Sequence, residues 1–200
     1  MIFIRKKLKR IFTKVKKGIK ELKTRFKTKL FQNKVQTFLI RVFPDKEIRY
    51  EDNLQMRKGV YAPEIDLTVG PFAIDDKKAN EFSELADEYQ VFLDLVKNRS
   101  INREEFDYHT NRNPRCFIGI EIENSTEKNP KHVEGSICNL HILSKVGILI
   151  AFNRKNTISK IYEYLRFAKE VKKTPDYLFK NVALISKANF EKIMREYPKT

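Results

Sequence analysis

Short apolar runs alternate with amphipathic helical segments from about residue 60 to the end of the chain. Residues 64–69 alternate polar and apolar side chains and stop at Gly70-Pro71, which predicts a strand closed by a turn. The same criteria predict a short strand near Val60, strands at 116–123, 147–152 and 182–185, and helices at 78–98, 132–145, 157–173 and 187–196. Because helices that alternate with strands cover a central sheet, this order predicts an α/β fold.

A basic helical segment precedes this alternation. Residues 1–35 hold fourteen Lys and Arg and one acid, Glu21, whereas the other 165 residues hold 27 basic and 25 acidic side chains. Apolar residues recur at steps of three and four from Ile4 to Leu30, which predicts an amphipathic α-helix. The apolar pattern continues to Phe43 and stops at Pro44. We therefore expect a basic helical arm over residues 1–43 and an α/β domain over residues 44–200.

The charge balance points to a polyanionic partner. The formal net charge is +15, and nearly all of it belongs to the arm. The arm admits three interpretations, which are not exclusive. Its lysines contact nucleic-acid phosphates, its apolar face lies in an anionic membrane surface, or its apolar face packs on the domain or on a second copy of the chain in a homodimer. Nucleic acid, DNA rather than RNA, is the partner we expect through this arm.

Other features favour a cytoplasmic protein. No segment after the arm is apolar for long enough to span a bilayer, and the arm lacks the uncharged apolar core of a secretory signal. Cys116 and Cys138 are too few for a disulfide framework or a four-thiolate zinc site. Because both lie in apolar runs, we expect buried free thiols in a reducing compartment.

Carboxylates at the ends of two predicted strands form the candidate site. Glu121 and Glu123 share one face of the strand 116–123, where Gly119 leaves room beside them, and Asp66 lies on the strand 64–69. If the two strands pair, these three carboxylates converge. They would then need a proton or a hard divalent cation such as Mg²⁺ or Mn²⁺. The alternative is a polar end of the sheet that meets solvent.

A family resemblance adds to this pattern. Pro63-Glu64-Ile65-Asp66, followed by Glu121-Ile122-Glu123 at the end of a strand, resembles the PD-(D/E)XK nuclease superfamily, which has the restriction-endonuclease-like fold. The strand, helix and strand of residues 116–153 also fit that core. The resemblance implies a central mixed sheet flanked by helices, with metal bound by Asp66 and Glu121. The superfamily usually has Lys at the position of Glu123. This chain therefore resembles the E-x-E variant of the superfamily, in which the second Glu serves as a ligand or base.

The expected function is therefore metal-dependent cleavage of nucleic-acid phosphodiesters. Asp66, Glu121 and Glu123 would bind Mg²⁺ or Mn²⁺ and take part in catalysis, and Lys145 on the following helix would give electrostatic help. One alternative is a non-catalytic nucleic-acid-binding or interaction protein on the same scaffold, which the missing Lys favours. Another is a peripheral membrane protein anchored by the basic arm.

Overall fold

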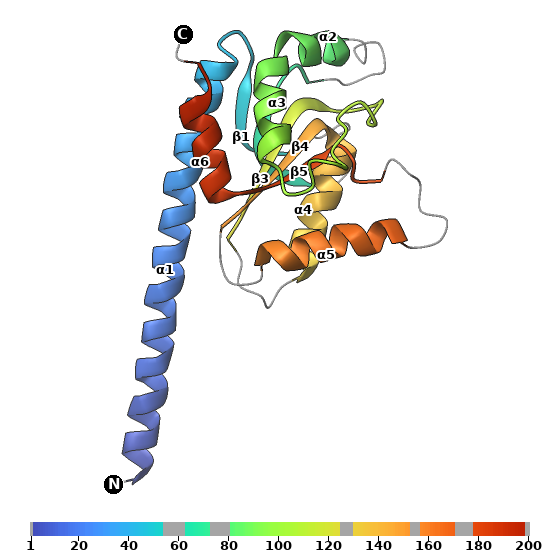
Figure 1. Cartoon of the computed structure of the whole chain (residues 1–200). Coiled ribbons are helices and arrows are strands. Elements are labelled where there is room, and N and C mark those ends of the chain that lie inside the picture. The colour runs from blue at the N-terminus through green and yellow to red at the C-terminus, as the bar shows by residue number, and fades with distance from the viewer. Residues whose placement is uncertain are drawn as a thin grey trace.

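The computed structural model describes residues 2–53, 63–72, 81–124, 130–152, 157–170 and 178–198. The elements in these ranges alternate along the chain as in an α/β protein (Figure 1). In chain order they are α1 (Ile2–Val42), β1 (Ile48–Asn53), β2 (Glu64–Val69), α2 (Glu81–Glu88), α3 (Gln90–Arg99), β3 (Cys116–Glu123), α4 (Pro130–Leu143), β4 (Ser144–Ala151), α5 (Thr157–Glu170), β5 (Val182–Ser186) and α6 (Lys187–Glu196).

The five strands form one mixed sheet in the order β1-β2-β3-β4-β5. β2 is antiparallel to both of its neighbours, whereas β3, β4 and β5 run parallel. Every residue of β4 is buried, as expected of a central strand covered on both faces. The α/β class and the mixed sheet flanked by helices are confirmed.

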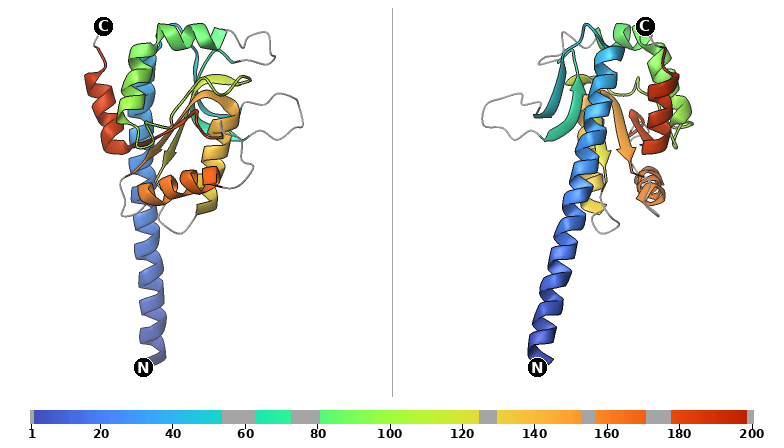
Figure 2. Two further views of the ribbon diagram at one scale, coloured as in Figure 1. Left: turned by 45° about the vertical axis from the view of Figure 1, so that its right-hand side comes forward. Right: turned by 90° about the vertical axis from the view of Figure 1, so that its left-hand side faces the viewer.

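Helices cover both faces of the sheet (Figure 2). On one face, the end of α1, with α2, α3 and α6, packs on strand residues such as Leu67, Ile118 and Ile148. On the other, α4 and α5 pack on Leu149 and Leu184. The sheet is therefore the middle layer of three, and its strand ends are the places where polar groups can reach solvent.

The basic segment and the domain are joined by one continuous helix. α1 has 41 residues and is about 62 Å long at 1.5 Å per residue. Its last turns belong to the core, where five side chains are no more than 5% exposed: Phe31, Val35, Phe38, Leu39 and Val42. Residues 31–43, assigned to the arm from sequence, thus supply part of the core of the domain. The earlier turns of α1 extend away from the sheet (Figure 1).

Several element boundaries differ from those expected. The helix predicted over 78–98 is two helices, α2 and α3, with a break at Tyr89. The helix predicted over 132–145 ends at Leu143, so Lys145 lies on β4. β1 was missed because it is a polar edge strand, although Ile48 and Tyr50 pack against the core. The strand predicted near Val60 lies outside the described residues.

The two cysteines differ in burial. Cys116 is buried, as predicted, whereas Cys138 is only partly buried, and both are free thiols. None of the described helices combines the length and the hydrophobicity that crossing a bilayer requires.

Candidate carboxylate site

β2 and β3 stop pairing at Asp66. Their paired register runs from Val69–Ile118 to Leu67–Ile120, and its continuation would place Asp66 opposite Glu121. Instead, the Asp66 Oδ2 atom accepts a hydrogen bond of 2.7 Å from the backbone N–H of Ile122. The carboxylate of Asp66 therefore takes the place of a backbone acceptor where the two strands separate.

A glutamine of α1 holds the other oxygen of this carboxylate. Gln32 Nε2 donates to Asp66 Oδ1 at 3.2 Å, and Gln32 Oε1 accepts from the Tyr50 hydroxyl at 2.8 Å. Gln32 is only 4% exposed, and the Tyr50 bond fixes which end of its amide faces Asp66. Sequence reasoning missed Gln32 because it lay in the segment assigned to the arm. The available signal was a polar residue beside Phe31 on the apolar side of the helix.

Asp66 and Glu121 form a carboxyl pair that shares a hydrogen bond. Burial, the negative charges of Asp66 and Glu123, and that hydrogen bond raise the pKa of Glu121 to about 9. Burial also raises the pKa of Asp66, against the Ile122 N–H bond that lowers it, and nearby acids raise it further. At neutral pH these effects favour one proton on the pair over two bare carboxylates.

The third expected ligand, Glu123, acts on this pair through its charge. It lies half-buried at the end of β3, and its carboxylate raises the pKa of both Asp66 and Glu121. Within the described ranges, no three His, Cys, Asp or Glu side chains are grouped so that they could hold one metal ion. The structure therefore brings together two of the three predicted ligands.

Two neighbouring carboxylates repel each other unless a positive charge lies between them. A hard divalent cation can supply that charge in place of the shared proton. Gln32 Nε2 and the Ile122 N–H group each donate to one oxygen of Asp66. A cation that replaced the proton shared with Glu121 would bind a lone pair that these two donors leave open. Mg²⁺ in proteins commonly binds one or two carboxylates and completes its shell with water and substrate phosphate. Asp66 and Glu121 are thus a donor set that suits Mg²⁺ or Mn²⁺.

The structure does not bring Lys145 to this pair. β3 and β4 are parallel, and Glu121 pairs with Leu149, which is four residues beyond Lys145. That separation corresponds to about 13 Å along the strand. Lys145 is 5% exposed, and its Nζ donates to the carbonyl oxygen of Asn111 at 3.1 Å. It therefore acts at the opposite end of the sheet, where burial lowers its pKa.

The room expected beside Gly119 is filled. A Cβ atom at this position would approach the Ser144 Cβ atom to 3.0 Å and the Leu140 Cδ2 atom to 3.2 Å. Gly119 pairs with Gly147 across β3 and β4, and Leu140 and Ser144 lie at the junction of α4 and β4. This glycine therefore permits the close approach of α4 to the sheet and opens no space for a ligand.

Comparisons with known protein families, with curated proteins and with solved structures found no match to this chain. The fold and the site define it as an α/β protein with a half-buried carboxyl pair at the point where two antiparallel strands separate.

Proposed function

We propose that this protein is a metal-dependent nuclease with a restriction-endonuclease-like fold, which cleaves phosphodiester bonds of DNA. The observation that carries the proposal is the position of Asp66: its carboxylate accepts from the Ile122 N–H group where β2 and β3 separate, and its charge helps to raise the pKa of Glu121. The parallel β3–α4–β4 unit beside this pair agrees with the core that the sequence resemblance implies. The basic first half of α1 supplies the charge that a polyanionic substrate requires.

In this proposal each residue near the pair has a defined task. Asp66 and Glu121 would hold the Mg²⁺ or Mn²⁺ ion, which supplies Lewis-acid stabilisation of negative charge on the phosphodiester. Gln32 and the Ile122 N–H group orient the Asp66 carboxylate, so Gln32 is a positioning residue. Glu121 would release its proton to solvent on binding the cation. Glu123, at the strand end, would accept a proton from the attacking water at its carboxylate.

A second candidate is a non-catalytic nucleic-acid-binding protein on the same scaffold. Two observations favour it: Glu123 stands where the superfamily usually has Lys, and no three-ligand group occurs among the described residues. The α1 helix also exposes apolar side chains, such as Leu22 and Phe26. An anionic membrane surface or a second copy of the chain could cover them, so both are alternative partners of this helix.

Cleavage of plasmid DNA tests the proposal. The wild type should nick supercoiled plasmid in the presence of Mg²⁺ or Mn²⁺ and stop when the cation is chelated. Asp66→Asn and Glu121→Gln should each abolish nicking while the folded circular dichroism spectrum is kept. Glu104→Gln is the matched control, since its side chain is 82% exposed and away from the pair. Absence of wild-type cleavage on both DNA and RNA would contradict the nuclease proposal and favour the binding protein.

A further inference from the structure

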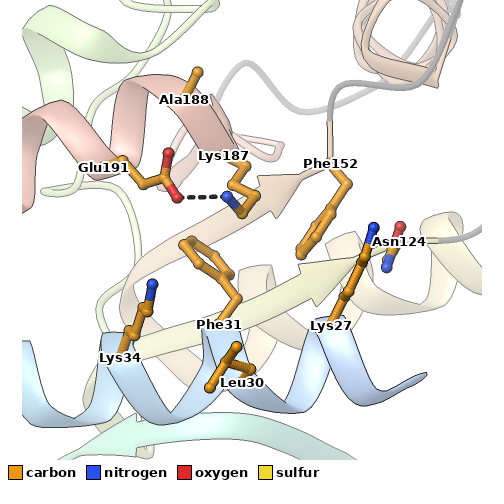
Figure 3. A pocket seen from close by; sticks show the side chains of 9 residues that line it. All are labelled: Lys27, Leu30, Phe31, Lys34, Asn124, Phe152, Lys187, Ala188 and Glu191. Carbon is orange, nitrogen blue, oxygen red and sulfur yellow. Dashed lines mark hydrogen bonds and ion pairs between the residues drawn. The ribbon is translucent and has the colours of Figure 1, made fainter. Parts of the chain in front are cut away.

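A cavity of about 540 Å³ lies where α1 and α6 meet the ends of β3 and β4 (Figure 3). Small-molecule sites in proteins occupy about 300–1,000 Å³, so a nucleotide fits this space. Its lining comes from two helices, α1 and α6, and from the residues that directly follow β3 and β4: Lys27, Leu30, Phe31, Lys34, Asn124, Phe152, Lys187, Ala188 and Glu191.

The lining is strongly cationic. Lys27, Lys34 and Lys187 face one acid, Glu191, which forms an ion pair with Lys187. Lys187 and Ala188 are also the first two residues of α6, so the positive end of that helix dipole lies at the cavity. An anion such as a phosphate group is therefore the ligand that complements this charge.

The floor of the cavity is aromatic. Phe31 and Phe152 pack edge to face with ring centroids 5.5 Å apart, and the Lys187 Nζ atom lies 4.9 Å from the Phe31 centroid. Phe31 is almost fully buried, whereas Phe152 is only partly buried. Phe152 can therefore offer a ring face to a planar ligand, and Phe31 supports it from behind.

The buried amide oxygen of Asn124 places a third requirement on the ligand. Asn124 Nδ2 donates to Thr28 Oγ1 at 2.7 Å, and that hydroxyl donates onward to the Thr24 carbonyl oxygen. This chain of hydrogen bonds fixes the orientation of the amide, and the buried Asn124 Oδ1 atom has no hydrogen-bond partner among the residues that the structure describes. An unmatched buried acceptor costs free energy, so a ligand N–H or O–H group that reaches it is favoured.

The cavity and the carboxyl pair share two elements. Phe31 lines the cavity, and the next residue of α1, Gln32, holds Asp66. Asn124 directly follows Glu123, the last residue of β3, and the Phe152 N–H group donates to the Glu123 carbonyl oxygen at 2.9 Å. A nucleic-acid strand whose phosphodiester lies at the carboxyl pair would therefore pass this cavity at the same end of the sheet.

We infer that this cavity binds one nucleotide of the nucleic-acid strand that the site acts on. The lysines hold its phosphate, Phe152 contacts its base, and Asn124 Oδ1 accepts from an N–H or O–H group of the nucleoside. The inference rests on the proposed function for its substrate class. It adds a binding site that needs neither the metal ion nor the carboxyl pair.

Calorimetric titration of the full chain with a 5′-phosphorylated thymidine dinucleotide, in the presence of a chelator, tests the inference. Lys34→Gln and Lys187→Gln should each weaken binding about tenfold, as removal of a charge-assisted hydrogen bond does. Arg25→Gln and Lys192→Gln are the matched controls, because each removes one exposed positive charge from the same helix as its test variant. Arg25 is nine residues before Lys34 and hence on the opposite side of α1. The controls should change the affinity less than twofold.

Two further probes separate the parts of the inference. Asn124→Leu and Phe152→Ala should each lower the affinity for the dinucleotide. The affinity for inorganic phosphate, which is lower in the wild type, should stay unchanged. Equal affinity for phosphate and dinucleotide, or equal losses in Arg25→Gln and Lys34→Gln, would overturn the inference, as would absence of saturable binding. Asp66→Asn should bind the dinucleotide normally. Dinucleotide binding without cleavage of any nucleic acid would therefore contradict the proposed nuclease function and leave the nucleotide site supported.

Discussion

The two halves of α1 carry similar apolar patterns and have opposite environments. In the first half, Ile19, Leu22, Phe26 and Leu30 are 49%, 67%, 71% and 50% exposed. In the second half, Phe31, Val35, Phe38, Leu39 and Val42 are almost fully buried. The helix continues through both without a break. Periodicity therefore predicts the helix and the side chains that share a face, but the partner that covers this face depends on the rest of the chain.

The two halves of α1 also contribute differently to the site and to the surface charge. The buried half reaches the candidate site, because Gln32 holds the Asp66 carboxylate. The exposed half contributes charge, and its apolar side chains at Ile19, Leu22, Phe26 and Leu30 are about half or more exposed. One half should therefore determine stability and the other half association.

The largest expected effect compares two phenylalanines of this helix. Phe38 packs on the rings of Phe92, Phe190 and Tyr197, whereas Phe26 is 71% exposed. Phe38→Ala should lower the free energy of unfolding by about 3–5 kcal/mol, and Phe26→Ala by less than about 0.5 kcal/mol. Urea unfolding followed by circular dichroism measures both. Equal losses would show that the exposed half is also packed in solution, for example in a homodimer.

The next effect sharpens the link between the buried half and the carboxyl pair. The pKa of Glu121 is about 9 in the folded state, whereas its ordinary value, which applies to the unfolded chain, is 4.5. The folded protein therefore keeps a proton that the unfolded chain loses, and the free energy of unfolding falls by about 1.4 kcal/mol per pH unit between those values. Glu121→Gln removes this dependence.

This variant should be more stable than the wild type by roughly 2–4 kcal/mol at pH 7 and equally stable near pH 4. Urea unfolding at pH 4, 7 and 8.5 gives the comparison, with Glu104→Gln as the control for loss of an exposed acid. A stability difference that does not change with pH would contradict the raised pKa of Glu121.

The smallest expected effect on stability comes from shortening the exposed half. Deletion of residues 1–22 removes nine Lys and Arg and one acid but keeps the buried side chains of α1 from Phe31 onward. The melting temperature should change by less than about 2 °C. Affinity for duplex DNA should fall, and the salt slope should decrease by about 0.9 for each phosphate that the shortened helix no longer reaches. Disappearance of the cooperative melt would contradict the division of α1. Liposome binding by the full chain that the deletion removes, with DNA affinity unchanged, would favour the membrane as the partner.

Much of the fold was predictable because local patterns decide it. The strands 64–69 and 116–123 and the helix 187–196 agree with the sequence-based prediction to the residue. β1 was not predictable from local pattern, since an edge strand with one apolar face and several charged residues resembles a loop. The break at Tyr89 and the shift of Lys145 onto β4 also escaped, because helix ends depend on packing as well as on propensity.

The site was predictable only in part. Alternation on two strands was enough to place Asp66 near Glu121, because strand pairing brings their rows together. It could not show that Asp66 bonds to Ile122 N–H, since this needs the strands to separate at that point. Gln32 comes from a segment 34 residues away, and the cavity joins two helices with the residues that follow β3 and β4, so both depend on tertiary structure.

In the proposed function, Asp66 and Glu121 exchange their shared proton for one divalent cation. Calorimetric titration with Mn²⁺ at pH 6.5, 7.5 and 8.5, in buffers of different ionisation enthalpy, tests it directly. One ion should bind and release about one proton, and its affinity should rise about tenfold per pH unit in this range, below the pKa of Glu121 near 9. Asp66→Asn and Glu121→Gln should remove this binding, and Glu104→Gln should keep it. Isotherms that are identical in the wild type and the two site variants, or the same at all three pH values, would contradict the claim.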